Sequence, residues 1–187
     1  MNAQSLAEYS LRAYTESTVD IDGAQALIED NVVAFRGTTS EDIVTDIRAV
    51  PWHSSELGVW CHSGFLKSLR KLLEDLPQGD IYVTGHSLGG AMAQIYAAML
   101  VKEGYNPKLV TFGAPRAGMK GLSELSSQCD GYRFVRDGDT IPNIPIYIPF
   151  LFPYRHDRVE FELEGADGIF SDHGMLGYLS VTPDMEV

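Results

Sequence analysis

The residues best suited to chemistry in this sequence are grouped around Ser87. Gly85, Ser87 and Gly89 form a Gly-x-Ser-x-Gly pattern that follows a short β-rich run over residues 80–84 and precedes a helical period. A serine on such a strand–turn–helix junction has strained backbone geometry and an exposed hydroxyl, and the glycines prevent clashes with the neighbouring strand and helix. The pattern predicts that Ser87 is a nucleophile, with an ordinary strand-to-helix turn as the alternative.

Leu88 opens the helix predicted after this turn. The apolar residues of that helix recur at helical spacing on one face: Met92, Ile95, Tyr96, Met99 and Leu100. The amide of Leu88 is expected to lie beside a carbonyl group attacked by Ser87. There the amide and the positive end of the helix dipole can stabilise a developing oxyanion.

A nucleophilic serine needs a base, and the base needs an acid that orients it. Of the five histidines, His173 lies on a late loop, downstream of Ser87 and of two candidate acids. This placement produces the order Ser, Asp, His that α/β hydrolases require, and a solvated loop histidine is the alternative. Asp137 and Asp139 both follow a strand predicted over residues 132–136, where an Asp suits either a turn cap or a triad acid.

The surrounding elements predict an α/β fold with a mostly parallel central sheet and helices on its faces. Strands predicted over residues 31–35, 80–84, 108–112 and 132–136 alternate with helices predicted over residues 64–76 and 88–100. Such alternation implies right-handed βαβ crossovers. Active sites of parallel sheets lie at the carboxyl ends of the strands, which is where Ser87, Asp137 and Asp139 are expected.

Further elements are predicted outside this central unit. Ser5 is expected to cap an N-terminal covering helix, and a hairpin is expected around Asp22 and Gly23. Residues 59–61 and the alternating run over residues 158–163 are each expected to form an edge strand.

Two apolar segments each allow two interpretations. Residues 41–49 place Ile43, Val44 and Ile47 on one face of a short helix, and an irregular stretch with Trp52 follows. This region is either surface or a lid over an apolar pocket. Residues 141–154 hold four prolines among apolar side chains, so they are expected to form an extended loop that fills core or walls a pocket.

Composition limits the other possibilities. At 187 residues and 44% hydrophobic content, the sequence predicts a single domain over residues 1–187. A formal net charge of -12 disfavours nucleic acid and anionic membrane surfaces as partners. We expect a soluble protein, cytoplasmic or released without a visible signal peptide, with no stable protein partner. The two cysteines, Cys61 and Cys129, are expected to be reduced and buried.

A set of motifs then appears in order along the chain. They are Phe35-Arg36-Gly37-Thr38, His62-Ser63-Gly64-Phe65, Thr84-Gly85-His86-Ser87-Leu88-Gly89-Gly90-Ala91, Thr111-Phe112-Gly113-Ala114-Pro115-Arg116 and Asp139-Thr140-Ile141-Pro142-Asn143-Ile144-Pro145. From about Asn31 to Tyr178, the chain resembles the class 3 lipases. This group contains the filamentous-fungal triacylglycerol lipases and related feruloyl esterases.

The resemblance implies an α/β-hydrolase fold with a short lid over residues 40–50. It implies a catalytic triad in which Ser87 is the nucleophile, Asp139 the acid and His173 the base. It also implies that the amides of Thr38 and Leu88 form the oxyanion hole, with the Thr38 hydroxyl held by Asp46.

The implied chemistry is hydrolysis of carboxylic esters through an acyl-enzyme, and it needs no metal or organic cofactor. The resemblance and the apolar segment over residues 141–154 favour esters of fatty or other apolar acyl groups, as in a triacylglycerol lipase. The expected partner is an ester or lipid substrate, with transient contact to a lipid interface. An acyltransferase or a phospholipase A1 with the same triad is an alternative. A non-catalytic binding module on a hydrolase scaffold is a further alternative.

Overall fold

The computed structural model describes residues 1–38, 50–145, 153–158, 160–165 and 173–187. A seven-stranded sheet runs through the molecule in the order β1 (Val19–Ile21), β2 (Ala24–Glu29), β3 (Val32–Phe35), β6 (Tyr82–His86), β7 (Lys108–Phe112), β8 (Asp130–Arg136) and β9 (Glu160–Leu163). The first two strands are antiparallel to their neighbours, and the strands from β3 to β9 are parallel. The predicted mostly parallel sheet is therefore confirmed.

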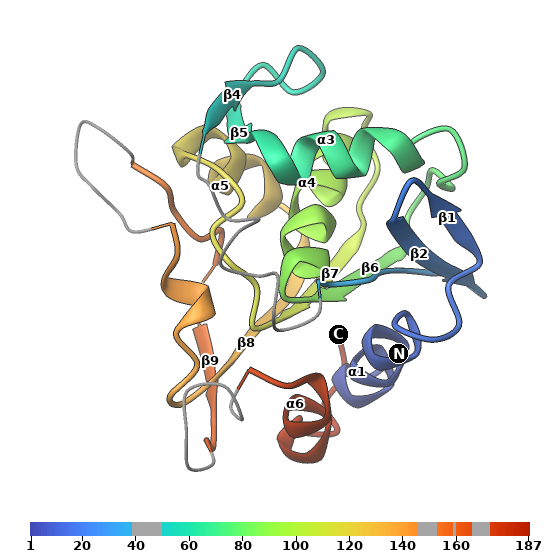
Figure 1. Cartoon of the computed structure of the whole chain (residues 1–187), viewed down its shortest axis with the longest axis vertical. Coiled ribbons are helices and arrows are strands. Elements are labelled where there is room, and N and C mark those ends of the chain that lie inside the picture. The colour runs from blue at the N-terminus through green and yellow to red at the C-terminus, as the bar shows by residue number, and fades with distance from the viewer. Residues whose placement is uncertain (39–49, 146–152, 159, 166–172) are drawn as a thin grey trace.

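Helices cover both faces of the sheet (Figure 1). One face carries α1 (Ala3–Arg12) and α6 (Met175–Val181), and the other carries α3 (Ser63–Leu72), α4 (Leu88–Lys102) and α5 (Lys120–Ser126). A short 3-10 helix, η1 (Ile141–Asn143), follows β8. The two ends of the chain meet beside α1, where Asn2 and Glu186 form an isolated bridge. Helix α5 has no counterpart among the elements predicted from the sequence.

The core is divided by the sheet because alternate strand residues point to opposite faces. In β3, Val33 and Phe35 join the cluster beneath α3 and α4, whereas Val32 joins the cluster beneath α1 and α6. All residues of β3 are buried, as expected of a strand covered on both faces. Helix α4 lies at the centre of the first cluster and is buried on most of its surface. The sheet and α4 thus provide a rigid base for the turn that joins them.

The first helix begins earlier than predicted. Asn2 is its N-cap, and the Asn2 side chain accepts a hydrogen bond of 2.8 Å from the backbone amide of Ser5. Ser5 therefore lies in the first turn, and its predicted capping role is wrong. Asn and Ser are similarly good N-cap residues. Asn2 takes the role because it lies three positions before the Ser5 amide, which has no acceptor within the helix.

The predicted hairpin is confirmed as β1 and β2, and the predicted edge strand near the C-terminus is confirmed as β9. The structure differs around Trp52. This residue lies in β4 (Pro51–His53), which pairs with β5 (Trp60–His62) in a separate two-stranded ribbon. Pro51 is tolerated there because the first residue of a strand need not donate to a ladder. The stretch predicted to be irregular is thus partly a strand.

The lid expected over residues 40–50, apart from Val50, lies outside the described residues, as does Asp46. The middle of the apolar segment, residues 146–152, also lies outside them. The lid, the role of Asp46 and the two interpretations of the apolar segment therefore stay predictions.

The thiol prediction is confirmed, because Cys61 and Cys129 are both free and buried. Burial raises the pKa of Cys61 to about 12 and that of Cys129 to about 11. Neither thiol is therefore ionised near neutral pH.

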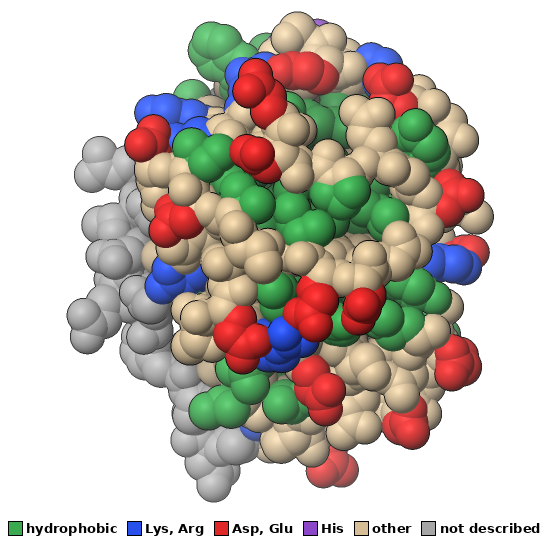
Figure 2. Space-filling model, turned by 90° about the vertical axis from the view of Figure 1, so that its right-hand side faces the viewer, with side chains coloured by type: hydrophobic (Ala, Val, Ile, Leu, Met, Phe, Trp, Pro, Cys, Tyr) green, Lys and Arg blue, Asp and Glu red, His purple; other side chains and the backbone are tan. Residues whose placement is uncertain are grey.

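The surface reflects the acidic composition. Acidic side chains are scattered over the face shown in Figure 2. Large exposed apolar side chains occur on and beside the two-stranded ribbon, where Trp52 is 55% exposed, Trp60 is 48% exposed and Val50 is 57% exposed. Among the helices of the described residues, none combines the length and apolar character needed to span a bilayer.

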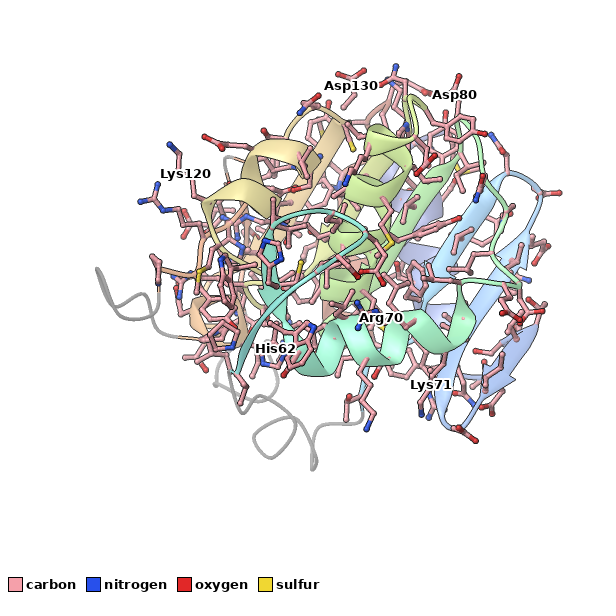
Figure 3. The ribbon with its side chains drawn as sticks, turned by 90° about the horizontal axis from the view of Figure 1, so that it is seen from above. His62, Arg70, Lys71, Asp80, Lys120 and Asp130 are labelled. Atoms are coloured by element: carbon pink, nitrogen blue, oxygen red, sulfur yellow. The ribbon has the colours of Figure 1, made fainter. Side chains whose placement is uncertain are left out.

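Three histidines predict a loss of stability in acid, of which His62 and His86 are buried and His156 is partly buried. Burial lowers the pKa of His62 to about 4 and that of His156 to about 3, and it lowers the pKa of His86 well below its ordinary value. His62 lies at the start of α3 (Figure 3), and neither of its ring nitrogens has a hydrogen-bond partner among the described residues. Below about pH 6.5 the unfolded chain binds protons at these rings while the folded chain does not, so folding is opposed progressively as the pH falls.

The measurement is urea unfolding of the wild type and of His62→Gln between pH 8 and pH 4. Stability is expected to be highest above pH 6.5 and to fall as the pH approaches 4. The His62→Gln variant removes one of the three groups, so its fall should be smaller by about 3 kcal/mol. An identical pH dependence in the two proteins would contradict this account of His62.

Candidate active site

Ser87 lies on the turn between β6 and α4, with backbone angles φ 56° and ψ -130°. Positive φ is strained for a residue with a side chain, and such strain is typical of functional turns. The turn closes only because glycines flank it. A Cβ on Gly85 would strike the backbone of Gly89, and a Cβ on Gly89 would strike the backbone of Phe35. The predicted strand–turn–helix junction is therefore present, and its strain lies at the predicted nucleophile.

Three predicted residues meet at this turn. The Nε2 atom of His173 lies 2.8 Å from the Oγ atom of Ser87, and its Nδ1 atom lies 2.8 Å from the Oδ2 atom of Asp139. Ser87 is 1% exposed, His173 is 5% exposed and Asp139 is 4% exposed, so all three residues are shielded from solvent. A histidine that donates from Nδ1 to a carboxylate presents Nε2 as an acceptor to the serine hydroxyl, the arrangement in which it can act as a base.

The structure separates the two candidate acids. Asp139 is buried and, among the described residues, accepts three hydrogen bonds, from His173, from the Tyr178 hydroxyl at 2.6 Å and from the Ile141 amide at 2.9 Å. Asp137 is exposed. The three donors fix the orientation of the Asp139 carboxylate, so Asp139 is the acid that the geometry places behind His173.

Tyr178 was not identified from the sequence. It is fully buried on α6, and its hydroxyl also accepts a hydrogen bond from the amide of Arg136 at 3.1 Å. Burial and the neighbouring Asp139 raise its pKa, so the hydroxyl remains a donor to the carboxylate. Gly113 makes room for both groups, because a Cβ there would strike Asp139 and the Tyr178 ring. Gly113, in the Thr111–Arg116 motif, is the local signal in the sequence that bears on the contact between Tyr178 and Asp139.

The two residues predicted to form the oxyanion hole line the same hollow. Thr38 and Leu88 both line a cavity of about 260 Å³, together with Arg36 and Gly37. Leu88 is the first residue of α4, so its amide has no acceptor within the helix. Their roles remain predictions, as does the support of Thr38 by Asp46.

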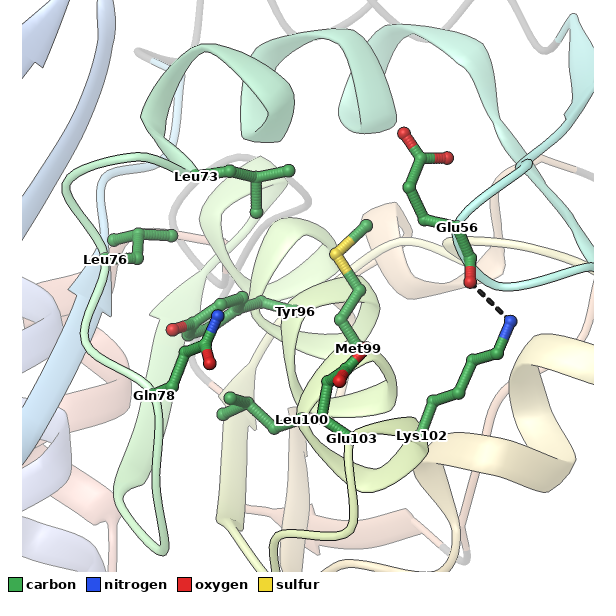
Figure 4. A pocket seen from close by; sticks show the side chains of 9 residues that line it. All are labelled: Glu56, Leu73, Leu76, Gln78, Tyr96, Met99, Leu100, Lys102 and Glu103. Atoms are coloured by element: carbon green, nitrogen blue, oxygen red, sulfur yellow. Dashed lines mark hydrogen bonds between the residues drawn. The ribbon is translucent and has the colours of Figure 1, made fainter.

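A second hollow lies away from this site (Figure 4). It has a volume of about 200 Å³ and is lined by the later turns of α4 and the segment after α3, including Leu76, Tyr96 and Met99. Lys102 closes one side through a hydrogen bond to the backbone carbonyl of Glu56. Its lining contains none of the predicted site residues, neither the three triad candidates nor Thr38 and Leu88.

Comparisons with known proteins identify the family of the chain. Residues 32–148 match the family described as Lipase (class 3). The secreted mono- and diacylglycerol lipase 1 of Fusarium solani is 35% identical over 122 residues, covering 58% of this chain and 36% of the relative. The secreted mono- and diacylglycerol lipase A of Penicillium cyclopium is 30% identical over 152 residues, covering 71% of this chain and 50% of the relative. The chain thus spans about a third to a half of the length of these relatives.

The fold is shared with solved lipases. The crystal structure of the lipase from Rhizopus microsporus var. chinensis matches with a TM-score of 0.70 at 20% identity, covering 98% of this chain and 78% of that one. This likeness shows an α/β-hydrolase fold, as the sequence predicted. The family match over residues 32–148, which is most of the sequence, establishes that this chain belongs to the class 3 lipase family.

Proposed function

We propose that this chain is a serine lipase that hydrolyses carboxylic esters of fatty or other apolar acyl groups. One observation carries the proposal: Ser87, His173 and Asp139 form a continuous hydrogen-bonded chain on a strained turn. A structural turn would not require this alignment. The membership of the family and the names of the fungal relatives favour a glyceride as the substrate.

Each proton transfer follows from the roles proposed for the three residues. His173 takes the hydroxyl proton of Ser87 on Nε2 as the Oγ atom attacks the ester carbonyl carbon, and Asp139 stabilises the resulting imidazolium. The carbonyl oxygen becomes an oxyanion, to which the backbone amides of Leu88 and Thr38 donate hydrogen bonds. When the tetrahedral intermediate collapses, His173 returns the proton to the leaving alcohol, and the acyl group stays on Ser87.

Water completes the cycle by the same steps. His173 removes a proton from the water molecule that attacks the acyl-enzyme, and then returns that proton to the Oγ atom of Ser87 as the carboxylic acid leaves. His173 accepts and returns every proton in both half-reactions, so the proposed steps need no metal or organic cofactor.

Contact with a lipid interface is part of this proposal. The predicted lid carries Ile43 and Ile47 on one face, and the exposed Trp52 and Trp60 lie on the ribbon that follows it in the chain. Indole rings favour the boundary between water and lipid. With a net charge of -12, the chain suits neutral or zwitterionic surfaces better than anionic ones.

The test is fatty-acid release from a neutral diacylglycerol, measured by titration as its concentration passes the solubility limit. We expect the rate to rise above a hyperbola once droplets form, because opening a lid exposes apolar surface that droplets cover. Zwitterionic vesicles should support more activity than anionic ones, and added salt should narrow the difference by screening.

The controls are Ile43→Ser and Ile47→Ser, which should flatten the rise while leaving hydrolysis of a dissolved short-chain ester intact. A plain hyperbola that is unchanged in both variants would indicate an esterase with a fixed, open site. Phospholipid consumed in preference to diacylglycerol would instead indicate a phospholipase.

A further inference from the structure

His86, the residue before the nucleophile, makes two hydrogen bonds that the mechanism above does not use. Its Nε2 atom lies 2.6 Å from the backbone carbonyl oxygen of His173, and its Nδ1 atom lies 2.7 Å from the hydroxyl of Tyr14. The ring is 3% exposed, and its centroid lies 4.7 Å from that of His173. The side chain therefore points away from the Ser87 hydroxyl and toward the backbone of the base.

The partners assign the protons. A carbonyl oxygen only accepts, so the Nε2 atom of His86 must carry a proton and donate it to His173. The Nδ1 atom of a neutral ring is then an acceptor, and the Tyr14 hydroxyl donates to it. Both ring nitrogens are thus satisfied in one tautomer.

The surroundings keep His86 neutral. Among the described residues, the titratable or charged groups in contact with it are Tyr14, His173 and Tyr178, and Arg36 lies over the Tyr14 ring. Burial lowers the pKa of His86, and His173 lowers it further. A neutral His86 adds no positive charge beside the imidazolium that forms on His173 during turnover.

Tyr14 reaches this position on the face of the sheet that carries α1 and α6. It lies just after α1, and Gly37 leaves space for its hydroxyl, because a Cβ on Gly37 would strike that hydroxyl and the carbonyl of His86. Tyr14 and His173 both lie outside the segment that matches the family, residues 32–148, whereas His86 lies within it. His86 therefore joins the two outer segments of the chain at the catalytic turn.

We propose that Tyr14 and His86 form a positioning pair that holds the backbone of His173, so that its imidazole ring stays between Ser87 and Asp139. This inference rests on the proposed triad. It makes His86 a positioning residue that touches neither the substrate nor the reacting atoms. Displacing a catalytic group by about 1 Å costs on the order of 10²-fold in rate, which sets the size of the expected effect.

The kinetic test compares variants at His86 and Tyr14. His86→Leu removes the donor to His173 and should lower kcat by about 10²-fold with KM nearly unchanged, because the substrate pocket is untouched. His86→Gln places an amide N–H near the former Nε2 atom and should recover about 10-fold of that loss. Tyr14→Phe should lower kcat by about 3- to 10-fold alone and have no further effect in the His86→Leu background.

Two controls match these changes. Tyr96→Phe removes a hydroxyl that binds the Pro77 carbonyl away from the site, and His62→Gln replaces another buried histidine. Both should keep kcat within about twofold. Equal losses in His86→Gln and His86→Leu, or unchanged kcat in His86→Leu and Tyr14→Phe, would overturn the proposal. If His86→Leu fails to fold, Tyr14→Phe carries the kinetic test.

A spectroscopic test separates this proposal from the proposed function. Nitrogen-15 NMR of the Ser87→Ala protein, which needs no activity, should show His86 as the neutral Nε2–H tautomer from pH 5 to pH 9. An Nδ1–H tautomer, or a ring that becomes protonated in this range, would overturn the positioning pair. Full activity in Ser87→Ala would instead overturn the triad and leave the NMR result to decide the pair.

Discussion

The Ser87→Ala variant is expected to lose about 10⁶-fold in kcat for ester hydrolysis while its stability stays close to that of the wild type. Removal of the Oγ atom leaves His173 with no nucleophile to activate, and the residues of a triad act as a unit, so one deletion forfeits nearly all of its contribution. Residual turnover comes from the oxyanion hole and substrate binding alone. Initial rates on a dissolved ester measure the loss, and thermal unfolding checks the fold.

Covalent labelling provides the direct readout of Ser87. A serine-directed phosphonate should modify the wild type once, at Ser87, and should not modify Ser87→Ala. Ser10→Ala is the matched control, because it also removes a buried serine hydroxyl, one that binds Thr84 within the core. It should be labelled at the normal rate. Labelling of another serine, with activity retained in Ser87→Ala, would move the nucleophile elsewhere.

The second large effect is expected at Asp139. Asp139→Asn should lower kcat by about 10⁴-fold with a small effect on KM, because an amide no longer selects the tautomer in which Nε2 of His173 accepts the proton of Ser87. The substitution also leaves the Tyr178 hydroxyl facing a group that both donates and accepts. Steady-state kinetics measure the loss, and slow phosphonate labelling should accompany it.

Asp137→Asn is the control for this prediction. Asp137 stands two residues earlier in the chain and is exposed. Its substitution should change kcat by no more than about twofold. A larger loss in Asp137→Asn than in Asp139→Asn would place the acid at Asp137, against the hydrogen bonds seen at His173.

The strands and helices that hold the site were largely predictable, because their patterns are local. The apolar run of β3 indicates a buried strand, and the glycines around Ser87 indicate a tight turn. Both patterns depend only on residues that are neighbours in the chain. Less marked elements were not predictable. Helix α5 has no cap from a side chain, and β4 is three residues long, so neither carries a strong signal of its own.

The candidate triad was predictable in type and order. Ser87 lies in a specific pattern, and His173 follows both Asp candidates in the chain. The residues themselves did not choose between Asp137 and Asp139, because a strand end followed by Asp-Gly-Asp offers two carboxylates at nearly the same place. The resemblance favoured Asp139, and the structure places Asp139 at the histidine with three donors.

The sequence by itself determined the strained turn at Ser87 and the strands and helices beneath it, because each depends on residues close together in the chain. It also determined the residue types and the order of the candidate triad, since Ser87 lies in a specific pattern and His173 follows the candidate acids. Only the tertiary structure decided what supports them. Tyr178 lies 39 positions from Asp139, and Tyr14 lies 72 positions from His86. Contacts over such separations form when α1 and α6 pack on the same face of the sheet, and no local pattern of residues encodes that packing.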